Sequence, residues 1–270
     1  MFPILLLQAP VHSEYYLPKG DVVGFTFFVS TFALLAAALF FLAERNNVPQ
    51  QWRTSMTVAG IICLIAGVNY FYMRGLYLTT GESPTQFRYI DWVLTVPMLA
   101  AQFYLLLSRA GAKMSSLWTL VIGALWMIAF GYVGEVSTTG HPMLWGFVST
   151  FGYVAIVYEV WFGRLAKVVD KSDNEEVVQA FNYLGYFVLI GWAIYPLGYM
   201  MLPGNLLQNL HLDMNLVYNF GDAINKVGFG LVVYSMARRA QQQAIASAAP
   251  TYVAPVYAEP VVAEIPEPVY

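Results

Sequence analysis

Long apolar runs, separated by short polar connections, fill the chain from about residue 22 to residue 236. Each run is long enough to cross about 30 Å of hydrocarbon as a helix. Helices are expected because lipid offers the backbone no hydrogen-bond partners, and the runs are too long for barrel strands. The pattern predicts an all-α membrane protein, a bundle of seven transmembrane helices at residues 22–42, 55–78, 87–107, 116–136, 143–165, 178–201 and 212–236.

The basic residues predict how this bundle is oriented. They gather in the connections after the first, third and fifth spans and after the last span, at Arg45, Arg53, Arg109, Lys113, Arg164, Lys167, Lys171, Arg238 and Arg239. The opposite side has little beyond Lys19 and Arg74. Because cytoplasmic loops are rich in lysine and arginine, we expect the N-terminus outside and the C-terminus in the cytoplasm of a cell inner (plasma) membrane.

Composition agrees with a membrane protein and narrows its partners. The chain is 59% hydrophobic and 11% charged, with a mean hydropathy of +0.57, which excludes an ordinary soluble domain. No basic cluster suggests nucleic acid. The single cysteine, Cys63, excludes an internal disulfide and a cysteine metal cluster, and three histidines are too few to suggest another metal site.

We expect three regions along the chain. Residues 1–20 form an extracellular N-terminal segment, and residues 21–240 form the bundle. Residues 241–270 are rich in proline, alanine and glutamate. Proline at that density prevents a helix, so a disordered cytoplasmic tail is predicted there.

The last span carries a lysine in its middle. Burying Lys226 in a bilayer costs about 2.5 kcal/mol on insertion scales, which makes it a candidate functional residue. Asp222 lies one helical turn earlier on the same face. The two residues could be a structural ion pair inside the bundle. Alternatively, Lys226 could hold a carbonyl cofactor as a Schiff base, with Asp222 in its counterion.

The third span carries a polar stripe. Arg88, Asp91 and Thr95 are spaced three and four residues apart, so they share one helix face that must point at protein or water. Gln102 follows eleven residues after Asp91, roughly 16 Å farther along the helix. In the fourth span, Glu135 lies at the outer end and is expected to be solvated.

The sixth span contributes a face of aromatic rings, formed by Trp192, Tyr195 and Tyr199 beside Pro196. Rings in this arrangement suit a long, flat, apolar cofactor. A positive Schiff base in such a dry pocket needs negative charge nearby. Asp91 and Asp222 can supply that charge, and Arg88 can keep both carboxylates ionised.

Three sequence blocks carry a resemblance to a known family. They are Arg88-Tyr89-Ile90-Asp91-Trp92-x-x-Thr95-x-Pro97, Trp192-x-x-Tyr195-Pro196 and Asp222-x-x-x-Lys226. In this order and at these depths they resemble the microbial (type I) rhodopsins, in particular the proteorhodopsin and xanthorhodopsin-like proton pumps of bacteria. The resemblance covers all seven spans, roughly residues 20–240.

The resemblance implies a role for each key residue. Lys226 would hold all-trans retinal, which light isomerises to the 13-cis form. Asp91 would be the primary counterion and proton acceptor, Asp222 the second counterion and Arg88 the outward gate. Leucine at position 99, rather than glutamine, resembles the green-absorbing members and not the blue-absorbing ones. The matching pocket positions are Trp92, Leu99, Met127, Gly131, Gly146, Ser149, Thr150, Tyr153, Trp192, Tyr195, Pro196 and Tyr199.

Two positions depart from the family pattern. The pumps usually carry a carboxylic acid where this chain has Gln102, and that acid returns a proton to the Schiff base from the cytoplasm. An amide cannot exchange that proton, so reprotonation should be slow. Many proteorhodopsins place a histidine, bonded to the counterion, at the position of Asn69. Here Asn69 is expected to bridge neighbouring helices.

These features predict a light-driven outward proton pump rather than an enzyme. The combination of Asp91, Thr95 and Gln102 argues against the chloride and sodium pumps of the family. The alternative is a sensory photoreceptor with a slow photocycle that signals to a partner protein. A retinal-free secondary transporter would need internal repeats, which the sequence lacks.

Two further ligand or partner expectations follow from the resemblance. Some xanthorhodopsin-like members have a glycine at the position of Gly146, which leaves a window that a carotenoid antenna can cover; the alternative is that Gly146 packs against a neighbouring helix. The family also suggests a symmetric homo-oligomer, a pentamer or a trimer, within the lipid bilayer.

Overall fold

The computed structural model describes residues 16–136, 141–202, 204–210 and 213–248. Within these ranges every regular element is helical, which confirms the predicted all-α class for the described part. Short 3-10 turns lie at Arg45–Asn47, Gln50–Trp52, Ser108–Ala110 and Gln208–Leu210. The α-helices are α1 (Val22–Glu44), α2 (Arg53–Thr80), α3 (Thr85–Leu107), α4 (Met114–Val136), α5 (Pro142–Trp161), α6 (Arg164–Val169), α7 (Glu175–Tyr186), α8 (Ile194–Met200) and α9 (Met214–Ala248).

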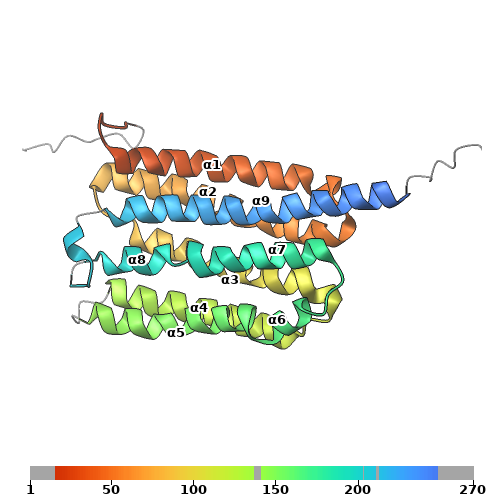
Figure 1. Ribbon diagram of the computed structural model, residues 1–270. Coiled ribbons are helices and arrows are strands. Elements are labelled where there is room, and N and C mark those ends of the chain that lie inside the picture. Colours follow the sequence, from red (N-terminus) through yellow and green to blue (C-terminus); the bar gives the residue numbers. More distant parts are fainter. Residues whose placement is uncertain (1–15, 137–140, 203, 211–212, 249–270) are drawn as a thin grey trace, which may run out of the picture.

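Six helical segments are long and apolar enough to cross a membrane. They are Val22–Asn47, Gln50–Thr80, Thr85–Ala110, Met114–Val136, Pro142–Val169 and Glu175–Met200, in agreement with the first six predicted spans. The last helix, α9, is longer still at 35 residues, but it carries several polar side chains along its length. It packs against α1, α2, α7 and α8 and runs along the same bundle (Figure 1).

The C-terminal boundary differs from the prediction. Residues 241–248 belong to α9, so the expectation of disorder from residue 241 is wrong for these eight residues. They contain alanine and glutamine, which favour helix, and no proline. Residues 1–15 of the predicted N-terminal segment and 249–270 of the predicted tail lie outside the described residues.

The sixth predicted span is not one regular helix. A π-helical turn, η4 (Phe187–Gly191), separates α7 from α8. By contrast, α3 continues as one helix through Pro97. The two membrane prolines therefore have different surroundings, and the break in the sixth span lies just before Pro196.

Side chains in the bundle are arranged with apolar groups facing outward and polar groups inward, as a lipid environment requires. Exposed large side chains include Phe32, Leu39, Phe147 and Ile190. Several polar and charged side chains of α3 and α9 are buried between the helices, among them Arg88, Asp91, Thr95, Gln102, Asn215, Asn219, Asp222, Asn225 and Lys226. The fold thus brings the polar faces of the third and last predicted spans together.

Candidate functional site

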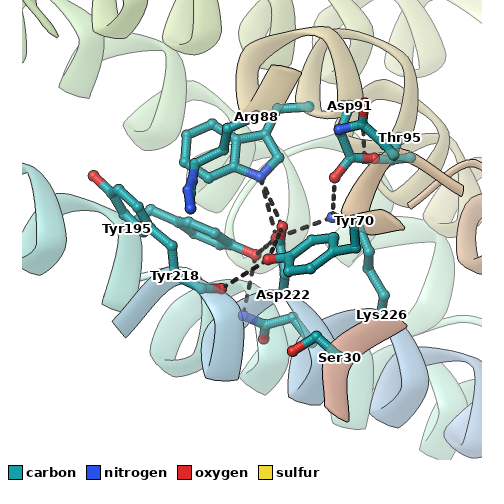
Figure 2. Close-up of polar contacts among 12 residues, drawn as sticks. Ser30, Tyr70, Arg88, Asp91, Thr95, Tyr195, Tyr218, Asp222 and Lys226 are labelled. Carbon is teal, nitrogen blue, oxygen red and sulfur yellow. Dashed lines mark hydrogen bonds and ion pairs between the residues drawn. The ribbon is translucent and has the colours of Figure 1, made fainter. Parts of the chain in front are cut away.

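The centre of the buried polar cluster is the amine of Lys226. Its Nζ lies 2.8 Å from Asp91 Oδ2 and 2.9 Å from Asp222 Oδ1, and the three side chains are at most 1% exposed. Figure 2 shows the amine between the two carboxylates. Asp91 comes from α3, whereas Asp222 precedes Lys226 by one turn of α9. The structure therefore brings together the three residues that the sequence analysis singled out.

Charge balance explains how these groups tolerate burial. A lone buried ammonium would carry a large desolvation cost, and two carboxylates beside it leave one negative charge in excess. Arg88, which is 0% exposed, supplies a second positive charge in the same region of the bundle. The four ionisable side chains together are formally neutral.

The two carboxylates differ in their other hydrogen bonds. Asp222 accepts bonds from the hydroxyl of Tyr70 at 2.9 Å, from the indole N–H of Trp92 at 3.1 and 3.2 Å and from the hydroxyl of Tyr195 at 2.7 Å. Each of these donors is neutral, and each stabilises a negative charge on Asp222. Asp222 is thus held as an anion by three side chains besides the lysine.

Asp91 has far fewer partners. Its Oδ1 is buried and accepts no hydrogen bond from any residue that the structure describes. The nearby hydroxyl of Thr95 donates to the backbone carbonyl of Asp91 at 3.0 Å rather than to its carboxylate. Asp91 therefore keeps an oxygen that can take up a proton without breaking an existing bond.

Arg88 contacts amides and a ring rather than the carboxylates. Its Nη2 donates to Asn215 Oδ1 at 3.1 Å and to Asn219 Oδ1 at 3.4 Å, and its guanidinium lies 4.9 Å from the ring centre of Tyr218. No ion pair joins it to Asp91 or Asp222 among the described residues. Any support that Arg88 gives to the two carboxylates therefore comes from its charge and not from direct contact.

The sequence analysis missed the two amides that hold Arg88. Asn215 and Asn219 lie seven and three residues before Asp222, and all three residues share one face of α9 with Lys226. Their helical spacing relative to Asp222 and Lys226 is the signal in the sequence that could have identified them. Both side chains are almost fully buried.

A second set of polar contacts lies at the end of the bundle where α3 begins. Ser83 donates to Asn215 Oδ1 at 2.9 Å, and Thr85 donates to Glu135 Oε1 at 2.9 Å. Glu135 is half-buried, and its Oε2 is buried without a partner among the described residues. The expectation that Glu135 is solvated is wrong, because the start of α3 packs over it.

Beside the ion cluster lies an aromatic cavity of about 350 Å³. Of the predicted pocket residues, those that line it are Trp92, Met127, Gly131, Gly146, Ser149, Thr150, Tyr153, Trp192, Tyr195, Pro196 and Tyr199. Leu99 does not line this cavity, although it is buried on α3. Lining residues that the sequence analysis did not assign to the pocket include Tyr89, Val96, Phe147 and Tyr218.

The cavity and the ion cluster are connected through shared side chains. Trp92 and Tyr195 both line the cavity and both donate to Asp222. A ligand in the cavity would therefore have an apolar, ring-lined space of a size typical of small-molecule sites. Lys226 is not itself a lining residue, and the cavity is separated from its amine by the Trp92 and Tyr195 side chains that bond Asp222. The residues fit a long, flat, apolar group that carries an aldehyde.

Gly146 has a packing role in this structure. A Cβ atom at this position would lie 2.6 Å from a ring carbon of Tyr199. The Tyr199 hydroxyl also donates to the backbone carbonyl of Pro142 at 2.6 Å, which holds the ring in place. Close packing against Tyr199 thus accounts for glycine here without a second ligand.

On the side of Asp91 away from Arg88, the α3 stripe ends at Gln102. Its Nε2 donates to the backbone carbonyl of Ser55 at 3.0 Å, and its Oε1 is buried without a partner among the described residues. Asn69 donates to the backbone carbonyl of Phe87 at 2.7 Å, which confirms the expected bridge between α2 and α3. In the described part of the chain, no group of three or more histidine, cysteine or acidic residues could hold a metal ion.

Comparisons with known proteins agree with these features. A profile of bacteriorhodopsin-like proteins matches residues 21–240. The green-light absorbing proteorhodopsin of Gamma-proteobacterium EBAC31A08 is 41% identical over 226 residues, which cover 82% of this chain and 88% of that protein. The crystal structure of blue light-absorbing proteorhodopsin from Med12 has a TM-score of 0.70 and 37% identity, and covers 82% of this chain and 100% of that one. Xanthorhodopsin, described as a light-driven ion pump with dual chromophore, has a TM-score of 0.69 and 27% identity, with 82% and 94% covered.

Proposed function

The chain belongs to the bacteriorhodopsin-like family, and on that premise we propose that it is a light-driven outward proton pump with retinal bound covalently at Lys226. It is a multi-pass membrane protein. The observation that carries the proposal is the Lys226 amine, held between Asp91 and Asp222, with Asp222 bonded by two side chains, Trp92 and Tyr195, that line an aromatic cavity. In the proposed arrangement α9 makes the seventh crossing, the N-terminus is outside and the C-terminus is cytoplasmic.

The protein's own residues are suited to hold the cofactor. Trp92, Trp192 and Tyr195 provide apolar ring surface around the cavity, and Lys226 provides the amine. Retinal bound there would supply light absorption and, on isomerisation, a change in the direction of the remaining N–H of Lys226. A nitrogen bonded to a cofactor carbon keeps one proton, so only one of the two carboxylates can receive it.

We propose that Asp91 receives this proton. Lys226 Nζ lies 2.8 Å from Asp91 Oδ2, which is hydrogen-bonding distance. Asp222 is an equally close neighbour, but its three neutral donors would each lose a charged acceptor if it were protonated. Asp91 has no such donors, and its Oδ1 is free among the described residues.

The outward path would continue from Asp91 past Arg88. Transfer of the proton would neutralise both the Lys226 nitrogen and Asp91 and leave Asp222 as the remaining anion of the cluster, so the guanidinium would then be drawn toward Asp222 and away from Asn215 and Asn219. Ser83 donates to Asn215, which also accepts from Arg88, so a movement of Arg88 would change the hydrogen bonds at the outer end of α3. Glu135, bonded to the neighbouring Thr85, is the nearby carboxyl group that could hold a departing proton.

Return of a proton from the cytoplasm would be the slow part of the cycle. Gln102 occupies the donor position, and a carboxamide has no proton to give at accessible pH. Its amide group already donates to the backbone of Ser55. A proton would have to pass this residue by way of water or another group, which supports slow recovery.

Illumination of cells that express the protein tests this function. Outward pumping should acidify the suspension, and a protonophore should abolish the change. The Lys226→Ala variant, which cannot attach the cofactor, should show no response and no colour with retinal. Alkalinisation would mean inward pumping and would contradict the proposal.

A sensory photoreceptor is the second candidate, and Gln102 is the observation that favours it, because slow recovery prolongs a signalling state. A coloured protein that gives no change of pH on illumination would support this alternative. Colour formation with retinal, lost in Lys226→Ala, would hold for both candidates. The pH measurement therefore separates them.

We also propose Gly146 as the position at which a carotenoid antenna can be tested. Gly146 borders the cavity beside the exposed Phe147, so a molecule in the lipid could approach there. Added hydroxylated carotenoid should appear in the excitation spectrum for retinal. An excitation spectrum without carotenoid bands would reject the antenna.

A further inference from the structure

The break between α7 and α8 has a clear cause in the backbone. Pro196 has no N–H, so a regular helix would leave the carbonyl of Trp192 without its donor. The N–H of Tyr195 donates to that carbonyl instead, at 3.1 Å. One turn earlier, the N–H of Trp192 reaches back five residues to the carbonyl of Phe187, at 2.9 Å, which forms the π-helical turn η4.

These shifted bonds release three carbonyls from the helical pattern. In a regular helix Val188, Leu189 and Gly191 would accept from the N–H groups four residues later. Those N–H groups belong to Trp192, Ala193 and Tyr195, and they donate to Phe187, Ile190 and Trp192 instead. Carbonyls in this position need other donors, because lipid provides none.

Two side chains from other helices supply those donors. The hydroxyl of Tyr153, on α5, lies 2.9 Å from the carbonyl of Leu189 and 3.2 Å from that of Val188. The Nδ2 of Asn225, on α9, donates to the carbonyl of Gly191 at 3.0 Å. Every carbonyl released by the break is therefore within reach of one of these two side chains.

The fit between α9 and the break is close along three successive positions. A Cβ atom at Gly191 would collide with Asn225 Oδ1, so a side chain at 191 would displace the amide. Gly228 lies against the ring of Phe187, and Gly221 lies against Ile194. Residues 221, 225 and 228 share one face of α9, so this face is shaped to the irregular segment.

Asn225 and Tyr153, the two donors to η4, also lie next to the ion cluster and the cavity. Asn225 directly precedes Lys226, and its Nδ2 lies 3.5 Å from the hydroxyl of Tyr195, which donates to Asp222. Tyr153 lines the aromatic cavity. A change at the Lys226 amine can therefore affect η4 through Asn225, and a change in the cavity can affect it through Tyr153.

We propose that Asn225 and Tyr153 are positioning residues that clamp the irregular turn η4, so that α7 is held against α9 until the site changes. The effect of this clamp on proton uptake rests on the proposed pump function. Release of the clamp would let α7 move relative to α8 and admit a proton toward Gln102 from the cytoplasm. The clamp would then set the rate of the step that this chain performs without a carboxylic donor.

Hydrogen–deuterium exchange of the full-length protein tests the clamp directly. Asn225→Ala and Tyr153→Phe each remove one donor to η4. Backbone amides in a peptide spanning residues 187–197 should exchange about fivefold faster in either variant, the factor that corresponds to about 1 kcal/mol for one hydrogen bond. Amides of α1 should keep their exchange rates.

Two matched variants provide controls. Asn69→Ala removes the same kind of amide-to-carbonyl bond between α2 and α3, and Tyr158→Phe removes a hydroxyl from the exposed face of α5. Neither should change exchange at residues 187–197. Equal exchange at these residues in Asn225→Ala, Tyr153→Phe and the unaltered protein would overturn the proposal, as would the same increase in the controls.

A flash experiment on the retinal-bound protein tests the consequence. In Tyr153→Phe, recovery of the dark absorption should become about fivefold faster, while protonation of Asp91, followed by its infrared carbonyl band, should keep its rate; a slower recovery would contradict the clamp. An equal effect on both steps would mean a general structural role and would reject the clamp as a control of proton uptake. Because exchange is also measurable without retinal, a failure of the pump function alone would leave the exchange result standing.

Discussion

Asp91 and Asp222 hold the same amine at 2.8 and 2.9 Å, yet they differ in all their other side-chain contacts. Asp222 accepts from Tyr70, Trp92 and Tyr195, whereas the second oxygen of Asp91 has no partner among the described residues. The two carboxylates are chemically alike, and their different hydrogen bonds make one more easily protonated than the other. One is built to remain an anion, and the other can change its charge.

Replacement of Asp91 by asparagine should abolish pumping and shift the absorption to longer wavelength. The amide accepts no proton, so transport should fall to the level of Lys226→Ala. Loss of the negative charge also destabilises a positive charge localised at the Lys226 nitrogen, which lowers the excitation energy. Visible spectra and light-induced pH changes measure the two effects. Asp170→Asn, at a surface position, is the control and should change neither.

Acidification of the unaltered protein should cause the same spectral shift. Protonation of Asp91 removes the same negative charge as the asparagine substitution does, so the absorption should move to longer wavelength as the pH falls and return as it rises. A titration of the dark spectrum measures this. The transition should be missing in Asp91→Asn, and a transition retained in that variant would assign it to Asp222 instead.

Much of this site could be predicted from helical periodicity. Spacings of three and four residues place Arg88, Asp91 and Thr95 on one face of α3, and a spacing of four places Asp222 beside Lys226. Polar side chains within apolar spans must face the interior, so the two faces had to meet. The ion cluster follows from these two facts without any knowledge of tertiary contacts.

The distribution of hydrogen bonds could not be predicted in the same way. Trp92 follows Asp91 in the sequence, yet its indole donates to Asp222 on another helix. Thr95 lies one turn from Asp91, but its hydroxyl bonds a backbone carbonyl, a local contact that competes with the carboxylate. These choices depend on how α2, α3, α8 and α9 are placed around one another.

The broken sixth span shows a similar limit. Pro196 was visible in the sequence, but the position and type of the irregular turn depend on the donors that meet it. Tyr153 and Asn225 come from α5 and α9, far apart along the chain. The sequence indicates where a helix is weak, while the partners that stabilise the weak point are set by tertiary packing.

Loss of one donor to Asp222 should weaken the site measurably. Tyr195→Phe removes the shortest of these bonds, at 2.7 Å, and leaves the ring in place. A hydrogen bond to a charged group contributes about 1.5–3 kcal/mol, so the retinal-bound protein should lose its colour at a lower temperature. Tyr132→Phe is the control, because the Tyr132 hydroxyl makes no hydrogen bond among the described residues. Equal bleaching temperatures in the two variants would contradict a role for the Tyr195 hydroxyl in holding Asp222.

A carboxylic acid at position 102 should speed the return to the dark state. Gln102 is fully buried on α3, and its amide bonds the Ser55 carbonyl, so a glutamic acid of similar shape can donate its proton to the same oxygen when neutral. A positioned acid typically accelerates proton transfer about a hundredfold or more, so Gln102→Glu should shorten recovery by at least about tenfold after a flash. Gln102→Met keeps the size without a proton to give, and it should recover no faster than the unaltered protein. If both variants recover at the same rate, the amide at 102 is not what limits proton uptake, and another barrier, such as the clamp at η4, controls the cycle.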